Sequence, residues 1–294
     1  MTEFASALQW GVERRLEFIE FRLFWEGGVN RSDLIKTFGV AVAQASKDLS
    51  LYQERAPSNA VYDKRAKRYV AGPDFRPKFL RPDPSTYLSR LRSLADGLVD
   101  SGNSWIGSPP DTDIAMTPRR RVEVGVLRSV LAAIREEASL EVFYQSMSKD
   151  RAEPSWRRMS PHAMGYDGFR WHARGFCHID GRFKDFLLPR ILDIRNRGER
   201  GALPNEDRQW AEVFDVVIGP HPDLTRNQKA VVEKDFGMAD GKAVLTVRYA
   251  MLFYVLKRLG LLEDARKLNA RTQHIVNLNR EETEQALKVA DFQL

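Results

Sequence analysis

Residues 30–54 read NRSDLIKTFGVAVAQASKDLSLYQE, and this stretch decides the fold of the N-terminal part of the chain. Asn30 and Ser32 are both good N-caps, and they precede a short apolar pattern that ends at Gly39. A second helix is predicted from about Val40 to Glu54, because apolar side chains recur on one of its faces. The apolar positions of the two helices are Leu34, Ile35, Phe38, Val42, Ala45, Leu49 and Tyr52. A short helix, a glycine turn and a second helix form the pattern of a helix-turn-helix.

The sequence on either side extends this pattern to a winged helix-turn-helix domain at residues 1–100. A helix is predicted from about Ala7 to Glu26, where apolar residues recur near 3.6-residue spacing until two glycines end it. After the helix pair, VYDKRAKRYV at residues 61–70 places apolar and aromatic residues on both sides of a basic tip. This is the pattern expected of a two-stranded wing.

Positive charge is concentrated around this wing. The chain has a net charge of +6, and residues 55–81 alone carry eight Lys or Arg against two Asp, whereas residues 201–294 are about neutral. Such a cluster favours a polyanionic partner, here double-stranded DNA. Early side chains of a recognition helix read base edges, and flanking cations hold phosphates. The candidate DNA contacts are Arg31, Ser32, Gln44, Ser46, Lys47, Lys64, Arg65, Lys67 and Arg68. The alternative is an ordinary small domain whose cations are solvated.

The rest of the chain predicts two further domains after a connector. SWIGSPPDTDIAMTPRR is rich in Pro, Gly, Ser and Asp, so residues 101–138 are expected to be a linker that ends in a helix. Residues 139–200 contain short strands and two Asp-Gly turns, at Asp167 and at Asp180. Residues 201–294 mix strands and helices. The fold class is therefore α+β and multidomain.

The strand-rich domain also holds an arginine-rich candidate site. Ten arginines and two lysines lie between Glu141 and Arg200, a preference that suits bidentate recognition of phosphate or carboxylate. If YQS and WHARGFC are strands, Tyr144 and Ser146 share a face, as do His172, Arg174 and Phe176. Trp171 and Cys177 are expected in the core. The candidate ligand contacts are Tyr144, Ser146, His162, His172, Arg174 and Arg190.

This domain resembles a WYL domain, a small Sm-like β-barrel found behind winged helices in bacterial transcription factors. The resemblance rests on Tyr144 and Ser146, on RMSPH at residues 158–162, on WHAR at residues 171–174, and on FLLPRI at residues 186–191. The chain departs from the family where His172 and Ala173 replace the usual Tyr and Leu.

The resemblance extends over the whole chain and is closest to phage-defence-associated repressors of the CapW/BrxR type. It implies a homodimer, paired through a C-terminal dimerisation domain at residues 201–294, that binds operator DNA with inverted half-sites. It further implies repression of a defence operon, relieved when an anionic or nucleic-acid-derived ligand fills the barrel. Related families also contain activators.

The sequence argues against several other classes. It contains no glycine-rich phosphate loop, nucleophile elbow or His-Glu-x-x-His helix, so we expect no enzyme, metal site or cofactor. A cryptic nuclease would need clustered carboxylates, for which Asp111, Asp113, Asp180 and Asp185 are available, but turn chemistry explains them more simply. We expect no membrane segment, no secretory signal and a cytoplasmic location with Cys177 reduced and inert.

One non-enzymatic alternative remains open. The barrel could bind single-stranded nucleic acid while the chain acts as an accessory module on a protein partner. That reading leaves the winged helix without a role. Selective binding of an operator duplex with a steep salt dependence would favour the regulator, and tight single-strand binding without duplex preference would favour the accessory module.

Overall fold

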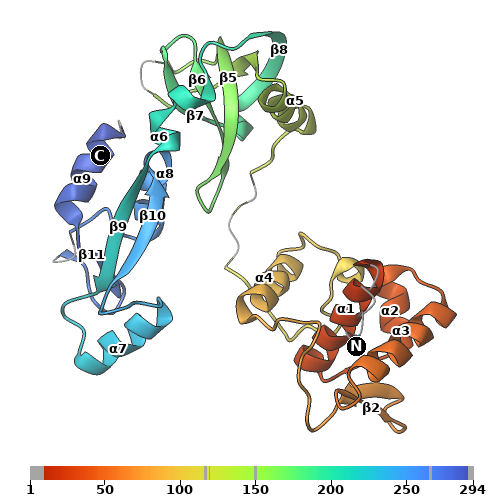
Figure 1. The fold of residues 1–294 in the computed structure, drawn as a ribbon. Helices are drawn as coiled ribbons and strands as arrows, with labels where there is room; N and C mark the ends of the chain where they lie inside the picture. The colour runs from red at the N-terminus through yellow and green to blue at the C-terminus, as the bar shows by residue number, and fades with distance from the viewer. Residues whose placement is uncertain (1–9, 116–117, 119, 149–150, 265–266, 291–294) are drawn as a thin grey trace, which may run out of the picture. The chain divides into compact units, whose positions relative to one another are not determined.

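The chain folds as two compact units, Met1–Thr117 and Pro118–Leu294 (Figure 1). The computed structural model describes residues 10–115, 118, 120–148, 151–264 and 267–290. Each unit has its own hydrophobic core, and each is described separately below.

The first unit contains the predicted helix-turn-helix and wing. Asn30 caps the second helix: its side chain accepts from the Asp33 amide at 3.1 Å, and the Asp33 carboxylate accepts from the Asn30 amide at 2.8 Å. Gly39 ends that helix with φ of 64°, a left-handed conformation that costs glycine little. Of the two predicted N-caps, Asn30 is therefore the one used. The elements of this unit are α1 (Trp10–Glu26), β1 (Gly28–Val29), α2 (Arg31–Phe38), α3 (Val42–Arg55), β2 (Ala60–Asp63), β3 (Arg68–Ala71), α4 (Pro84–Ala95) and η1 (Ser101–Asn103).

The wing is a small antiparallel sheet with the order β1-β3-β2. Its register pairs Tyr62 with Tyr69, whose rings lie 5.1 Å apart. The core beneath it is formed by the inward faces of α1, α2 and α3, as the apolar spacing predicted, except that Val42 at the start of α3 is 58% exposed. The fully or nearly fully buried members are Leu16, Phe18, Ile19, Leu23, Val29, Leu34, Ala45, Leu49, Tyr52, Ala56 and Ala60.

A buried carboxylate fixes the segment that follows the wing. Glu20 of α1 has no solvent exposure and accepts hydrogen bonds from the backbone amides of Lys78, Phe79 and Leu80 at 2.7–2.9 Å. Tyr52 Oη and Asn59 Nδ2 donate to the same carboxylate at 3.0 and 3.3 Å. The charge is therefore fully coordinated inside the domain, which is the condition under which a buried carboxylate is tolerated.

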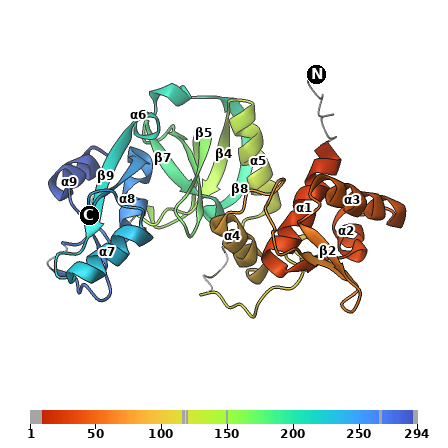
Figure 2. The ribbon, with the colours of Figure 1, turned by 60° about the horizontal axis from the view of Figure 1, so that its bottom comes forward.

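The first part of the second unit is a five-stranded antiparallel sheet with the order β7-β6-β5-β4-β8, and α5 packs on it (Figure 2). No ladder joins the edge strands β7 and β8 within the described residues, so the sheet is open by this criterion. The elements are α5 (Val124–Arg135), β4 (Ala138–Tyr144), β5 (Ser155–Tyr166), β6 (Trp171–Cys177), β7 (Arg182–Leu187), η3 (Leu188–Arg190) and β8 (Ile191–Glu199).

Two sequence expectations about this sheet need correction. Trp171 was expected in the core, but its side chain is half exposed, and its ring lies 4.8 Å from that of Tyr166 on the neighbouring strand. Ser146 was expected on a strand face shared with Tyr144, but β4 ends at Tyr144 and Ser146 lies in the following loop. Cys177 is buried, as expected.

The C-terminal part of the unit is a second, three-stranded sheet with the order β10-β9-β11. Helices α8 and α9 pack against each other beside this sheet, and α7 packs against β9 (Figure 1). The elements are η4 (Pro204–Glu206), α6 (Arg208–Ala211), β9 (Val213–Pro220), α7 (Arg226–Asp235), β10 (Ala243–Arg248), α8 (Tyr249–Arg258), β11 (Ile275–Asn277) and α9 (Arg280–Val289). This confirms the mixed α/β character predicted for residues 201–294.

Candidate DNA-binding face and effector site

The exposed side of α3 and the wing enclose a hollow of about 570 Å³. Five of the predicted DNA contacts line it: Arg31, Ser32, Ser46, Lys67 and Arg68. Arg31 Nη1 donates to Ser46 Oγ at 3.5 Å, which joins the first turn of α2 to α3. Lys47 is exposed on the same helix and makes no ion pair within the described part of the chain.

The remaining predicted DNA contacts divide into exposed and structural groups. Lys64 and Arg65 are exposed at the wing tip, where the Asp63 carboxylate accepts from the Arg65 amide at 2.8 Å. Gln44 instead donates to the Asp48 carboxylate at 2.9 Å, which restricts its freedom to reach a base. Arg68 Nη2 donates to the Glu26 carbonyl at 3.1 Å and so supports the root of the wing.

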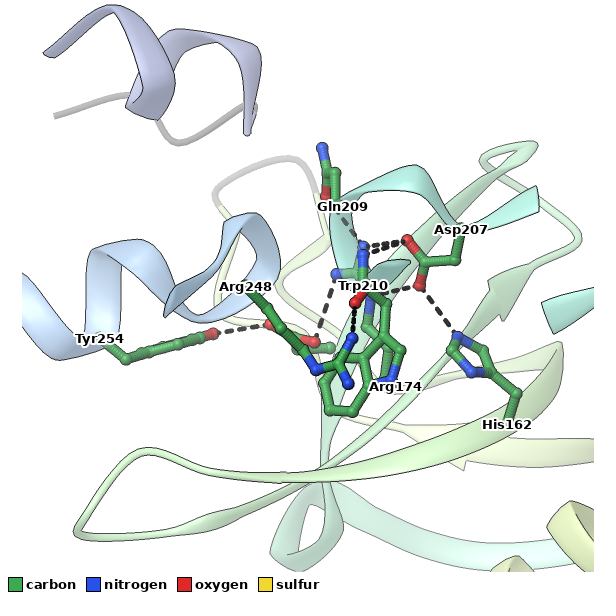
Figure 3. A network of polar contacts seen from close by, with 8 residues as sticks. His162, Arg174, Asp207, Gln209, Trp210, Arg248 and Tyr254 are labelled. Atoms are coloured by element: carbon green, nitrogen blue, oxygen red, sulfur yellow. Dashed lines mark hydrogen bonds and ion pairs between the residues drawn. The ribbon is translucent and has the colours of Figure 1, made fainter. Parts of the chain in front are cut away.

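The second candidate site is centred on Arg174 of β6, which is only 3% exposed. Its Nε and Nη2 donate to the two carboxylate oxygens of Asp207 at 2.7 and 2.9 Å (Figure 3). Nη2 also donates to Gln209 Oε1 at 2.8 Å, and Nη1 donates to Asp185 Oδ1 at 3.3 Å. This bidentate geometry is the strongest form of the arginine–carboxylate pair.

Asp207 lies at the N-cap of α6 and is 1% exposed. Burial alone would raise the pKa of its carboxyl group, but hydrogen bonds from Arg174 and His162 lower it to about 2. His162 Nε2 lies 2.9 Å from Asp207 Oδ2 and approaches from β5 (Figure 3). Asp207 therefore joins two strands of the first sheet to the start of the C-terminal elements.

The network continues into α8. Tyr254 Oη donates to Asp185 Oδ2 at 3.0 Å, and burial, with the charge of Asp185, raises the pKa of Tyr254 above its usual range. The His172 ring lies 4.8 Å from the Tyr254 ring, and its Nε2 lies 3.1 Å from Asp167 Oδ2. Burial lowers the pKa of His172, so this imidazole is held neutral.

A hollow of about 570 Å³ lies directly beside Arg174. Besides Arg174 and its two acid partners, cationic side chains line it at the surface. These are Arg182, Lys184 and Arg208. Lys184 is paired with Asp180 at 2.9 Å. The exposed Glu206 also lines the hollow, so three cations and one acid form its rim, while the guanidinium at its base is already neutralised by Asp207 and Asp185.

The structure brings three of the six predicted ligand contacts into this network and places the other three elsewhere. His162, His172 and Arg174 belong to it through Asp207, Asp185 and Tyr254. Tyr144 is a core residue whose Oη accepts from the Leu187 amide at 3.2 Å. Ser146 Oγ contacts Ser148 Oγ at 3.1 Å, and the Arg190 carbonyl accepts from the Gln145 amide at 3.0 Å.

Sequence reasoning missed the acidic partners of Arg174. Asp207 lies 33 residues downstream of Arg174 and, in sequence, resembles a turn residue. The available signal was general: a buried arginine needs a compensating acid. It could not single out which of the acids of residues 201–294 supplies that charge.

A winged helix-turn-helix with an exposed cationic face, followed by an arginine-bearing sheet and a separate α/β region, defines a transcriptional regulator. The first region matches the BrxR transcriptional regulator winged helix-turn-helix domain at residues 11–93. Residues 125–196 match the WYL domain, and residues 213–283 match the BrxR transcriptional regulator C-terminal dimerization domain.

Full-length relatives agree with these domain matches. The DNA-binding transcriptional repressor CapW of Stenotrophomonas maltophilia is 42% identical over 286 residues, which cover 97% of this chain and 95% of that protein. The proteins of the same name from Escherichia coli (strain KTE188) and Pseudomonas aeruginosa are 39% and 38% identical, over 87% and 93% of this chain and 85% and 91% of theirs. The chain belongs to this CapW/BrxR family of DNA-binding transcriptional repressors. Its dimerisation domain supports a homodimer.

Two further findings complete the comparison. Among solved structures, the match with proteasome accessory factor B/C (PafBC) of Arthrobacter aurescens covers 94% of this chain and 46% of the PafBC chain, at 17% sequence identity and a TM-score of 0.29. This similarity is too weak to inform the domain arrangement. Within the described residues, every helix is too short or too polar to cross a membrane.

Proposed function

We propose that this repressor leaves its operator when an anionic, nucleic-acid-derived ligand binds beside Arg174. The observation that carries the proposal is the bidentate Arg174–Asp207 pair at the base of a cationic hollow. Phosphate presents oxygens to guanidinium in the same way as a carboxylate does. The position that Asp207 occupies is therefore also a suitable position for a ligand phosphate.

The ligand would act by competing with Asp207 for Arg174. Arg174 and His162 belong to the WYL sheet, whereas Asp207 begins the segment that leads into the dimerisation domain. Displacing this carboxylate would loosen the junction between the two, and the cationic rim would attract the incoming anion. To act as an allosteric effector, the ligand must prefer the loosened state by a coupling free energy of about 1–3 kcal/mol.

On the DNA side, we propose that α3 reads the operator and the wing holds its phosphates. Lys47 and Ser46 are the assigned base readers, with Arg31, Ser32, Lys64, Arg65 and Lys67 on the phosphates. Gln44 and Arg68 are retained as contacts of the same face, although each is engaged within the domain. A two-fold dimer would present two such faces to inverted half-sites.

Two finer features of the proposal follow the family resemblance. We propose that the WYL sheet closes as an Sm-like barrel, which is supported by its edge strands β7 and β8 being joined only by the three residues of η3. We also propose that the protein is cytoplasmic and that the genes it controls form a phage-defence operon. Tyr144, Ser146 and Arg190 remain candidate contacts for a ligand larger than the hollow at Arg174.

The test is release of bound duplex by short single-stranded oligodeoxynucleotides with a terminal phosphate. Binding of the dimer to its own upstream DNA is measured by fluorescence anisotropy for the wild type and for Arg174→Gln. The wild type should bind the duplex and lose it on addition of the oligonucleotide. Arg174→Gln breaks the pair with Asp207 without a ligand, so it should bind the duplex more weakly from the start and respond little to the oligonucleotide. Arg128→Gln, which removes an exposed cation of α5 that does not line this hollow, is the control for a general charge effect. Equal release from wild type and Arg174→Gln would refute the proposal.

A further inference from the structure

The winged-helix unit contains a second hollow, of about 550 Å³, between α1, α4 and the segment after η1. It shares no lining residue with the hollow on the DNA-binding face. Its size falls within the range of small-molecule sites. Its polar wall consists of two arginines, a tryptophan, hydroxyl groups, an amide and one carboxylate: Arg14, Arg90, Trp105, Ser85, Thr86, Ser89, Ser93, Ser104, Asn103 and Asp83.

The two guanidinium groups lie against the same indole. The Cζ atoms of Arg14 and Arg90 are 4.1 and 4.4 Å from the Trp105 ring centroid. Arg90 also lies over Phe21, at 5.2 Å. Trp105 in turn packs edge-on against Phe18 and Phe21, so the platform is part of the domain core. Aromatic contact positions both cations without neutralising them.

Arg90 has no acidic partner within the described residues. Its Nη1 is buried and donates no hydrogen bond, and its side chain makes no ion pair, within the described residues. The nearby carboxylates are engaged by other groups: Glu17 pairs with Arg14, the other arginine of this hollow, at 2.7 Å, and Asp83 caps α4 through the amides of Ser85 and Thr86. Burial and the neighbouring charge of Arg14 lower the pKa of Arg90, which reflects this uncompensated cation.

An uncompensated, partly buried guanidinium is costly, so its retention calls for an anion. Hydroxyl groups from successive turns of α4 line the same hollow, at Ser85, Ser89 and Ser93. Two arginines with adjacent hydroxyl donors are the usual partners of a phosphate group in proteins. We propose that this hollow is a second anion site, in which Arg14, Arg90 and the α4 hydroxyls bind the phosphate of a small nucleotide-type ligand. The site is independent of the effector site at Arg174.

The site can be tested on the full-length protein by fluorine NMR after incorporation of fluorotryptophan, with the Trp105 resonance assigned from Trp105→Phe. The probes are AMP, inorganic phosphate and adenosine. AMP and phosphate should shift the Trp105 resonance saturably, and adenosine should not. Arg90→Gln should weaken binding by about tenfold or more, as expected for a lost charge-assisted hydrogen bond.

Matched variants separate this site from the others. Arg92→Gln, exposed on the same helix, and Arg174→Gln should both leave the AMP-dependent shift of the Trp105 resonance unchanged. If Arg90→Gln does not fold, Arg14→Gln provides the same test at a more exposed position. The proposal is overturned if neither AMP nor phosphate shifts Trp105, if Arg90→Gln or Arg14→Gln binds as wild type does, or if the resonance responds only to operator duplex.

Discussion

Removing the charge of Asp207 should destabilise the second unit by an amount that the structure allows to be calculated. Asp207→Asn keeps the size of the side chain and an oxygen that can cap α6, but it loses the negative charge facing Arg174. The pKa of Asp207 is lowered from 3.8 to about 2 in the folded state. At 1.36 kcal/mol per pKa unit, neutralising this carboxyl group costs about 2.5 kcal/mol of folding stability.

A second argument gives a similar value. Removing one partner of a buried ion pair typically costs about 3–5 kcal/mol, and Arg174 keeps Asp185 at 3.3 Å as a remaining acid. The expected loss for Asp207→Asn is therefore about 2–3 kcal/mol. The measurement is urea unfolding followed by tryptophan fluorescence, because Trp210 lies beside this pair.

The control is Glu212→Gln, which removes an exposed carboxylate from the same segment and should change the free energy of unfolding by less than about 0.5 kcal/mol. The wild type should also lose the Asp207 contribution in acid. A lowered carboxyl pKa stabilises the fold above about pH 3.8, and the stabilisation disappears as the pH falls through about 2. If Asp207→Asn were as stable as Glu212→Gln, the pair would not hold the junction together.

Four further outcomes are expected. Lys47→Ala should weaken binding to the operator by about 1–3 kcal/mol and change the affinity for a scrambled duplex little. Lys64→Ala should weaken binding to both duplexes and reduce the slope of log affinity against log salt concentration by about 1. Anisotropy titrations at several salt concentrations measure both effects. Glu20→Gln should destabilise the winged-helix unit by about 3 kcal/mol in chemical denaturation, because an NH2 group replaces one of the two acceptor oxygens and then faces hydrogen-bond donors. An unchanged midpoint would contradict the assigned role. Gly175→Ala should lower the free energy of unfolding by about 1–3 kcal/mol, because the new Cβ would lie 2.7 Å from the Ser160 carbonyl oxygen. An unchanged melting temperature would contradict this close packing. The lowered pKa of His172 means that stability falls as the pH drops below about 6.5, and His172→Gln should flatten this part of the stability curve.

Local features of the sequence were sufficient to predict the helix-turn-helix. The apolar spacing and Gly39 located α2 and α3 to within about two residues, which is the usual precision of helix ends. The Asp180-Gly181 pair correctly located the turn between β6 and β7, where Gly181 has φ of 62°. These features depend on neighbouring residues, so they are visible in the sequence.

Features that depend on distant residues were not predicted. The strand β5 was missed because its sequence, SWRRMSPHAMGY, is rich in polar residues and contains Pro161, which sits where the pairing with β6 shifts register. Trp171 was misplaced because strand alternation puts it on the same face of β6 as the core residues Ala173 and Cys177. It is, however, the first residue of the strand, where its half-exposed ring contacts Tyr166 and not the core. The acids that hold Arg174 come from β7 and α6, and only the folded chain brings them together.

The central claim is that a ligand at Arg174 controls the binding of this repressor to its operator. The most direct measurement is a titration of the dimer, bound to its own upstream duplex at near-physiological salt, with terminally phosphorylated single-stranded oligodeoxynucleotides. A scrambled duplex and the Arg174→Gln variant are run in parallel. The account predicts selective duplex binding by the wild type that the oligonucleotide reverses, and weaker duplex binding by Arg174→Gln that the oligonucleotide hardly changes. Indifference to duplex sequence with tight single-strand binding, or equal release from both proteins, would contradict it.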